Sequence, residues 1–528
     1  MIGESPNCGS RKLVAGVDTS TQSTKVRVTD AATGELVRFG KAKHPVGTSV
    51  DPEYWWQAFL KACEEAGGLD DVSAISVGGQ QHGLVLLDRS GRVIRDAILW
   101  DDTRSAPQSD EIIRTFGAID DLNHIPKGPW HTPMVVSGES AHSKNSDDCE
   151  ATKLGTQRWV HAIGSAPVTC FTISKLAWVA EYEPENAARI AAICLPHDWL
   201  SWRIAGFGPV DEGEDAHLEA LVTDRSEASG TGYFDAANNR YLYNFIDMVL
   251  GRHDIILPKV LGPREASPFR ASAKVAGSAI DDGCIIGPGG GDNEIAAFGL
   301  NMVAGDASIS LGTSAVAEAV APEPVYDLSG MLAGYAECTG HYLPEAGTLN
   351  GSRILDAGCK LLSVGYEELS SLALSSVPGA KGLTLLPYFD GEYIPIRPNA
   401  NAALSGMTLS NTTPENVARA FVEALLCSVR DCLELIKQFD GGITRILLIG
   451  GGAKSKAVRV LAPAIFEMPV TIPAEDEYVA IGAARQAAWV LSGEEEPPQW
   501  KLKIEAVQTG TPTPEVYESY AKVRGDMQ

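Results

Sequence analysis

The chain has 528 residues, of which 44% are hydrophobic and 21% charged, values typical of a globular protein with room for two or more domains. Its net charge of −25 argues against nucleic acid or an anionic membrane surface as a partner, because both repel an acidic protein. The N-terminus lacks the apolar core of a signal peptide, no apolar run reaches membrane-spanning length, and the ten cysteines include no C-x-x-C pair. We therefore expect a cytoplasmic protein with reduced cysteines, such as Cys194, Cys284 and Cys427 in apolar segments.

The chain begins with an apolar run, Leu13–Val17, that leads into a loop of small hydroxyl residues and returns through Val26–Thr29. This pattern predicts a β-hairpin with a polar tip. Ser20 and Thr21 lie in that tip, where hydroxyls and backbone N–H groups are compact donors for phosphate oxygens. An ordinary hairpin is the alternative interpretation. The Gly-x-x-x-x-Gly-Lys-Ser/Thr loop of P-loop enzymes is absent from the sequence.

Asp18 closes the first predicted strand, directly before the hydroxyl loop. A carboxylate beside phosphates is repulsive unless a divalent cation lies between them. The position therefore indicates a residue that binds Mg²⁺ or positions water. The alternative is a turn-forming aspartate bonded to its own backbone.

Two polar segments follow in the first half of the chain. GGQQHG (Gly78–Gly83) joins two apolar strands, 74–78 and 84–88, and its Gln80, Gln81 and His82 side chains suit a polyol. LWDDTRS then places Trp100 beside Asp101 and Asp102, with Arg104 close by; aromatic faces next to carboxylates are typical of sugar sites. The alternatives are a structural histidine in the first segment and a surface salt bridge beside a core tryptophan in the second.

The middle of the chain mixes helical and aperiodic segments. Residues 174–182 and 184–192 are predicted to be helical. The stretches 120–156 and 206–217 are polar and show no period, so we expect surface insertions there. Each could be a tolerated loop, a lid or an oligomer contact.

A glycine run ends in a single acid at GPGGGDNE (Gly287–Glu294). The glycines permit a sharp turn and close approach of a ligand, and Asp292 stands where a reacting hydroxyl could release its proton. The alternative is an aspartate that caps a helix starting near Glu294. Both roles are compatible, because a backbone-anchored aspartate is also well oriented.

The second half repeats the first pattern. Residues 307–317 predict another hairpin, with Gly312-Thr313-Ser314 at its tip. A long helix is expected from Pro414, a buried strand at 445–450 that runs into GGGAKS (Gly450–Ser455), another strand at 470–472, and a helix at 479–491. A glycine-rich turn after a strand can pass under an adenine or ribose. The repetition indicates a duplicated α/β fold that holds nucleotide phosphates between its halves.

Seven segments occur in the order found in the FGGY family of carbohydrate kinases: 16–25, 78–83, 99–104, 171–178, 289–293, 310–314 and 450–455. The chain resembles this family over roughly residues 13 to 492. The resemblance implies two ribonuclease-H-like domains of the actin/hexokinase/Hsp70 type, with ATP in an interdomain cleft. The segments 79–83 and 99–104 are most similar to the members that phosphorylate xylulose, although Gln81 stands where some members have Met.

The resemblance also implies roles for individual residues. Asp292 would be the general base and Asp18 the acid that holds Mg²⁺, through water. The sugar contacts would be Gln81, His82, Trp100, Asp101, Asp292 and Asn293. The nucleotide contacts would be Ser20, Thr21, Gly312, Thr313, Gly351, Gly451, Gly452 and Ala453.

The expected organisation is a sugar-binding domain at 13–300, a nucleotide-binding domain at 301–492 and a tail at 493–528. The expected reaction is the ATP- and Mg²⁺-dependent phosphorylation of D-xylulose. Ribulose, gluconate and glycerol are alternative substrates, and an actin-like ATP-binding regulator without a small substrate is the alternative of another class. Partners would be a sugar and a nucleotide, without nucleic acid or membrane, and a homodimer is possible.

Overall fold

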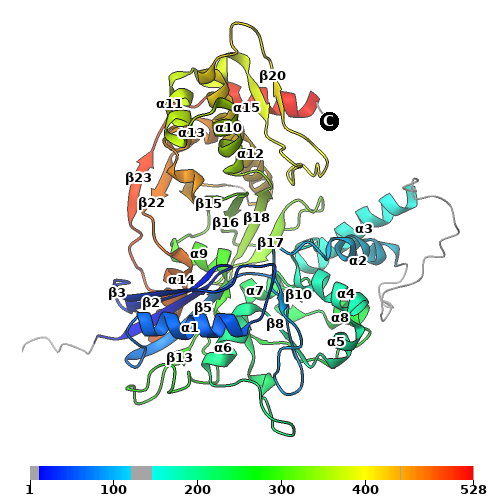
Figure 1. Cartoon of the computed structure of the whole chain (residues 1–528), viewed down its shortest axis with the longest axis vertical. Helices are drawn as coiled ribbons and strands as arrows, with labels where there is room; N and C mark the ends of the chain where they lie inside the picture. The colour runs from blue at the N-terminus through cyan, green and yellow to red at the C-terminus, as the bar shows by residue number, and fades with distance from the viewer. Residues whose placement is uncertain (1–10, 120–145, 441, 527–528) are drawn as a thin grey trace, which may run out of the picture. The chain divides into compact units, whose positions relative to one another are not determined.

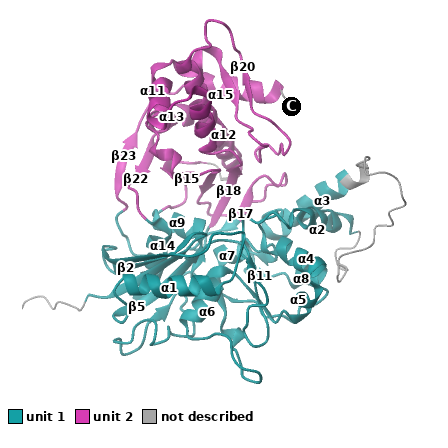
Figure 2. Cartoon of the chain, viewed as in Figure 1, with its two compact units in different colours: residues 1–301, 335–341, 477–501 teal, residues 302–334, 342–476, 502–528 magenta. Residues whose placement is uncertain are grey.

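The computed structural model describes residues 11–119, 146–440 and 442–526. It divides into two compact units (Figure 2). Unit 1 comprises residues up to 301 together with 335–341 and 477–501, and unit 2 comprises 302–334, 342–476 and 502–528. The chain therefore passes between the units more than once. In particular, residues 477–501 return to unit 1 and carry the helix predicted at 479–491.

Unit 1 is built on a sheet in which the first strand is central. The strands, in their order across the sheet, are β13 (Ile285–Ile286), β5 (Val72–Gly79), β1 (Leu13–Thr19), β2 (Ser23–Asp30) and β3 (Leu36–Lys43), and β14 (Gly290–Gly291) also pairs with β5. β1 runs parallel to β5 and antiparallel to β2, so the predicted hairpin forms. All seven residues of β1 are buried, which explains its continuous apolar run.

Helices cover both faces of this sheet (Figure 1). Leu13, Ala15 and Val17 belong to the same core cluster as residues of α1 (Glu53–Glu65). Val14 instead packs with Ala484 of α14 (Tyr478–Ser492) on the other face. Here Gly16 allows close packing, since a Cβ atom would lie 2.0 Å from the Ala480 carbonyl oxygen.

Unit 2 repeats the arrangement. Its sheet contains, in order, β18 (Tyr342–Thr348), β16 (Ala315–Ala319), β15 (Asp306–Leu311), β21 (Arg445–Ile449), β22 (Val470–Pro473) and β23 (Ile504–Gln508). As with β1, strand β15 is antiparallel to its hairpin partner β16 and parallel to a later strand, β21. The two sheets therefore share one pattern, and the predicted duplicated α/β fold is confirmed.

The remaining elements surround these sheets. In unit 1 they are β4 (Ser49–Val50), β6 (Val85–Leu87), β7 (Ala97–Ile98), α2 (Ala106–Ala118), α3 (Ser146–Ile163), α4 (Thr172–Tyr182), α5 (Pro184–Arg189), β8 (Ala192–Cys194), α6 (Pro196–Ile204), η1 (Leu218–Ala220), β9 (Val222–Asp224), α7 (Arg225–Ser229), β10 (Phe234–Asp235), β11 (Arg240–Tyr241), α8 (Tyr243–Leu250), β12 (Lys259–Leu261) and α9 (Asp292–Gly299). In unit 2 they are α10 (Arg353–Leu362), α11 (Tyr366–Ser375), η2 (Pro378–Gly382), β19 (Thr384–Leu386), β20 (Ala403–Ser405), α12 (Pro414–Asp440), η3 (Gly452–Lys454), α13 (Lys456–Phe466) and α15 (Pro514–Asp526). Strand β17 (Ala333–Ala336), which contains the boundary between the units, instead belongs to the sheet of unit 2 as the edge strand beside β18.

The prediction of an aperiodic surface insertion at 120–156 is wrong for its last residues. Residues 120–145 lie outside the described part, but 146–156 form the first turns of helix α3. This helix packs closely on α2, where a Cβ on Gly117 would lie 1.8 Å from the Ala151 carbonyl oxygen and one on Gly155 1.9 Å from that of Ile113. The first turns of this helix show no apolar period and are stabilised by the packing on α2, which is why the sequence pattern missed them. The other expected insertion, 206–217, has no helix or strand.

Among the described residues, no helix combines the length and the apolar character needed to cross a membrane. Cys194, Cys284 and Cys427 are free and buried, as predicted from their apolar surroundings.

Candidate active site

Asp292 is the first residue of helix α9, directly after the glycine run. Its carboxylate accepts a hydrogen bond from the backbone N–H of Asn293, at 3.1 Å to Oδ1. Burial, and next the nearby charge of Asp18, raise the pKa of Asp292 to about 7. The residue thus both joins the first turn of a helix and has a pKa suited to proton transfer near neutrality.

The three glycines before Asp292 make room for protein groups. A Cβ on Gly289 would lie 2.3 Å from the ring of His197, and one on Gly290 would lie 3.0 Å from Cys338 Sγ. A Cβ on Gly291 would lie 2.3 Å from Glu294 Oε2. Close packing of the protein on itself therefore accounts for these glycines, in addition to the turn expected from the sequence.

Asp18 lies near the end of β1, buried to 2% exposure. Its Oδ2 atom is 2.8 Å from Lys25 Nζ, the residue opposite it in the hairpin. Lys25 also contacts Glu477 Oε2 at 2.7 Å. Burial raises the pKa of Asp18, and the Lys25 charge opposes that shift. The side chain bonds to a lysine of the facing strand, and its Oδ1 atom makes no hydrogen bond among the described residues, so the interpretation as a turn-forming aspartate bonded to its own backbone is wrong.

Lys25 and Glu477 had no predicted role in the site. The hairpin register pairs positions 18 and 25, so the sequence held a signal for Lys25. Glu477 lies far along the chain, and no local pattern connects it with Asp18.

His82 is buried and strongly held. Its backbone has a positive φ of 65°, unusual for a residue with a side chain. Nδ1 lies 2.9 Å from the Gly230 carbonyl oxygen, and the ring stacks on Phe171 with centroids 5.1 Å apart. Burial, and next the charge of Lys175, lower the pKa of His82 to about 3. The imidazole is therefore neutral, with Nδ1 as donor to Gly230 and Nε2 as acceptor.

Lys175 is a second buried group that the sequence did not single out. Its Nζ donates to the His82 carbonyl oxygen at 3.1 Å and to that of Cys170. Burial lowers the pKa of Lys175 to about 8. The lysine holds the backbone of His82 in its unusual conformation, which helps to fix the imidazole.

Gln81 and Asn293 lie beside Asp292, as the sequence suggested. Asn293 Nδ2 donates to Gln81 Oε1 at 3.2 Å, and Gln81 Nε2 donates to Glu294 Oε1 at 2.6 Å. The neighbouring Gln80 is connected to the first hairpin, because Thr21 Oγ1 donates to its Oε1 at 3.5 Å.

The tryptophan segment approaches the same hairpin. Trp100 is 47% exposed and donates from Nε1 to Thr21 Oγ1 at 3.1 Å, so it is not the core tryptophan of the alternative interpretation. Asp102 is buried, and Arg104 and Thr48 hold both of its oxygens. Asp101 is exposed and has no such clamp. Of the two acids, Asp101 is thus the one open to a ligand.

Ser20, the other predicted hydroxyl of this hairpin, bonds within its own loop. Its Oγ donates to the Ser23 carbonyl oxygen at 3.2 Å. Its backbone carbonyl oxygen lies 2.9 Å from His44 Nε2. The tip of the first hairpin is therefore fixed both by a hydrogen bond within its own loop and by a contact with His44.

The predicted nucleotide positions of unit 2 gather around the tip of its hairpin. Gly312 and Thr313 are exposed at the tip, and the Gly351 N–H donates to the Thr313 carbonyl oxygen at 2.9 Å. A Cβ on Gly452 would lie 2.9 Å from the Leu311 Cβ at the end of β15. Gly451, one residue earlier, is exposed, and Ala453 is buried. Unit 2 therefore brings this set together.

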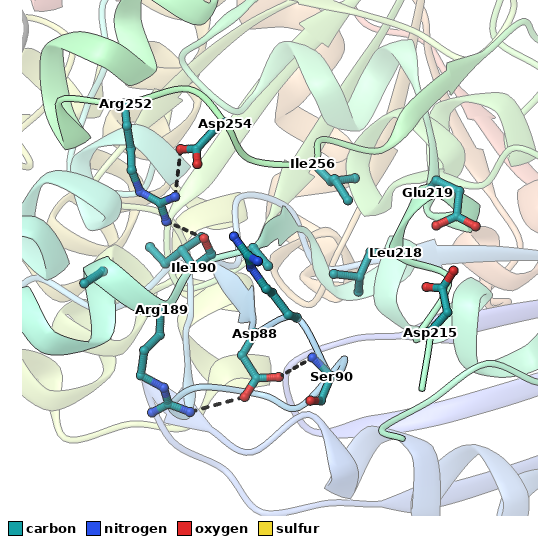
Figure 3. Close-up of a pocket in the computed structure, with 13 residues that line it drawn as sticks. Asp88, Ser90, Arg189, Ile190, Asp215, Leu218, Glu219, Arg252, Asp254 and Ile256 are labelled. Atoms are coloured by element: carbon teal, nitrogen blue, oxygen red, sulfur yellow. Dashed lines mark hydrogen bonds and ion pairs between the residues drawn. The ribbon is translucent and has the colours of Figure 1, made fainter. Parts of the chain in front are cut away.

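A pocket of about 520 Å³ lies elsewhere in unit 1 (Figure 3). None of the predicted site residues lines it. Two of its cations have acidic partners, Arg189 with Asp88 at 3.3 Å and Arg252 with Asp254 at 2.8 Å. We assign this pocket no part in catalysis.

Comparison with known proteins identifies the family. Residues 13–137 and 139–299 match the N-terminal domain of the FGGY family of carbohydrate kinases, and residues 307–491 match its C-terminal domain. The chain belongs to this family. It is a sugar kinase of the FGGY type, as the sequence predicted.

The similarity of this FGGY kinase to individual relatives covers most of its own chain and most of each relative. It is 36% identical to a xylulose kinase of Streptomyces coelicolor over 92% of this chain and 89% of that protein. Its structure is similar to the crystal structure of xylulose kinase from Bifidobacterium adolescentis, with a TM-score of 0.90. The two sequences are 62% identical, and the match covers 98% of this chain and 100% of that one. A Plasmodium falciparum glycerol kinase with ADP, at 18% identity and a TM-score of 0.76, shares the fold over 98% of this chain and 97% of that one.

Proposed function

We propose that this kinase transfers the γ-phosphoryl group of ATP to D-xylulose, giving D-xylulose 5-phosphate and ADP. The observation that carries the chemistry is the position of Asp292, which the backbone N–H of Asn293 anchors and whose pKa is raised to about 7 by burial and by the charge of Asp18. The choice of sugar is supported by the xylulose kinases that the chain matches over 92% and 98% of its length.

In the proposed mechanism, Asp292 accepts the proton of the terminal sugar hydroxyl. The hydroxyl oxygen forms the new bond to the γ-phosphorus while the bond to the β,γ-bridging oxygen breaks, and ADP leaves with that electron pair. The neutral His82 offers Nε2 as an acceptor for a sugar hydroxyl. Trp100 and Asp101 would supply a stacking face and a further acceptor.

Asp18 fits a magnesium site. Lys25 holds its Oδ2 atom, whereas Oδ1 is buried and makes no hydrogen bond within the described residues. A carboxylate oxygen left open in this way is a ligand type that Mg²⁺ prefers, directly or through water. When bound, Mg²⁺ would offset the charge of the phosphates.

We assign nucleotide contacts to both hairpins and to the glycine turns of unit 2. These residues are Ser20, Thr21, Gly312, Thr313, Gly351, Gly451, Gly452 and Ala453. Sugar binding is assigned to residues 13–300 and the nucleotide chiefly to 301–492, with 493–528 as a tail. A homodimer stays a prediction.

The test is ADP release with Mg-ATP and a panel of D-xylulose, D-ribulose, L-ribulose, gluconate and glycerol. We expect strong stimulation by D-xylulose alone. Stimulation by another acceptor would keep the mechanism and change the substrate. ATP binding without stimulation by any acceptor would contradict the proposal and favour a regulator.

A further inference from the structure

Glu294 is a buried carboxylate for which the sequence suggested no role beyond starting a helix. It is fully buried, two residues after Asp292 in the first turn of α9. Its Oε1 atom accepts a hydrogen bond of 2.6 Å from Gln81 Nε2, across 213 residues of chain. A short hydrogen bond at a buried position strongly restrains both side chains.

The carboxamide of Gln81 is held at both ends. Glu294 accepts from its nitrogen, and Asn293 donates to its oxygen at 3.2 Å. The Glu294 oxygen accepts and the Asn293 amide nitrogen donates, so the two partners together define which way the carboxamide faces.

Gly291 leaves the space for this pair. A Cβ there would lie 2.3 Å from Glu294 Oε2 and 2.8 Å from Gln81 Cγ. A side chain at position 291, directly before Asp292, would therefore clash with both Gln81 and Glu294.

Two side-chain hydrogen bonds join the Gln81 loop to the first turn of α9. Asn293 donates to the Gln81 side chain, and that side chain donates to Glu294. Loss of the Glu294 acceptor would leave a buried amide donor unsatisfied, and Gln81 would have to move to recover a partner. Movement of Gln81 would in turn release the side chain of Asn293, whose backbone N–H donates to Asp292 Oδ1.

We propose that Glu294 is a positioning residue that acts through Gln81 and Asn293 to hold the Asp292 carboxylate in the orientation that accepts the sugar proton. This inference rests on the proposed function, since it gives Asp292 the part of the base. It also makes Gln81 a structural link between Glu294 and Asp292 as well as a predicted sugar contact.

The first experiment compares Glu294→Ala with Glu294→Gln in steady-state kinetics on the preferred acceptor of the panel. Glu294→Ala is expected to lower kcat roughly 10- to 100-fold, with a smaller change in the KM for ATP, because a slightly misplaced base is costly. Glu294→Gln keeps an oxygen that can accept from Gln81 and should stay within about three-fold of the wild type. Glu423→Ala is the control, because it removes a similarly buried carboxylate of unit 2 that Arg419 holds, and should leave kcat unchanged.

A double-mutant cycle tests the path through Gln81. When Gln81 is already replaced by Met, adding Glu294→Ala should lower kcat by less than about three-fold relative to Gln81→Met alone. The reason is that the hydrogen bond between Gln81 and Glu294 is already lost. Full additivity would overturn the path through Gln81. An unchanged kcat in Glu294→Ala, or an equal loss in Glu294→Gln, would overturn the positioning role.

Crystal structures of the wild type and of Glu294→Ala provide a readout that needs no substrate. The proposal expects Asp292 to turn away from its wild-type orientation when Glu294 is absent, and an unmoved Asp292 would refute it. If the wild type phosphorylates no acceptor, the proposed function fails, and the orientation of Asp292 in the two crystals still decides the positioning role.

Discussion

Replacement of Asp292 by asparagine should stabilise the protein while it abolishes sugar phosphorylation. The pKa of Asp292 is about 7 in the folded protein against an ordinary 3.8. A difference of about three units corresponds to about 4 kcal/mol between the two protonation states. Since the residue is partly exposed, water screens part of this cost, and we expect about 2 kcal/mol.

The sign of the pH dependence follows from proton binding. Between pH 3.8 and about 7, folded Asp292 keeps a proton that the unfolded chain has released. The stability of the wild type therefore falls as the pH rises through this window, and the loss is complete above it. The asparagine variant lacks this slope. Its advantage should grow from near zero at about pH 4 to about 2 kcal/mol at about pH 8.

Urea unfolding of both proteins at about pH 4, 6 and 8 measures this difference. Asp281→Asn, at an exposed acid of unit 1, is the control and should show no such growth. An Asp292→Asn variant that is less stable than the wild type at the highest pH, or a difference that does not change with pH, would refute the reasoning. The same pKa governs catalysis, so kcat/KM for the sugar should rise with pH around a midpoint of about 7.

Three further predictions concern other parts of the site. His82→Ala should raise the KM for the sugar more than it lowers kcat, because Nε2 is an acceptor and not the base; a rise confined to the KM for ATP would place His82 with the nucleotide. Lys25→Met should lower the free energy of unfolding by about 2 kcal/mol, measured in urea, because two carboxylates lose the cation between them; unchanged stability would contradict this. Gly291→Ala should lower kcat at least about ten-fold through the clash with Glu294, while Gly365→Ala, with open space at its Cβ, should match the wild type in the same assay.

The local sequence pattern was sufficient to predict several of the helices and strands that carry or surround the candidate site. The apolar run 13–17 became buried β1, and the three–four spacing after Pro414 became helix α12, which begins at that proline. The repeated hairpins predicted a duplicated α/β fold, which the two sheets confirm. These features depend on residues close in the chain, whose apolar period directly reflects which face is buried. The order of the seven family segments added Asp292 and its neighbours as an expectation.

The interactions that give the site its chemistry join residues far apart in sequence. The pKa of Asp292 depends on burial and on the charge of Asp18, which belongs to the first strand of the chain. The Gln81–Glu294 hydrogen bond spans 213 residues, and Lys25 meets Glu477 only because residues 477–501 return to unit 1. The sequence determined which strands and turns present the side chains. Only the tertiary structure decided which of them meet, because desolvation, Coulomb interaction and hydrogen bonding depend on distance in space and not on distance along the chain.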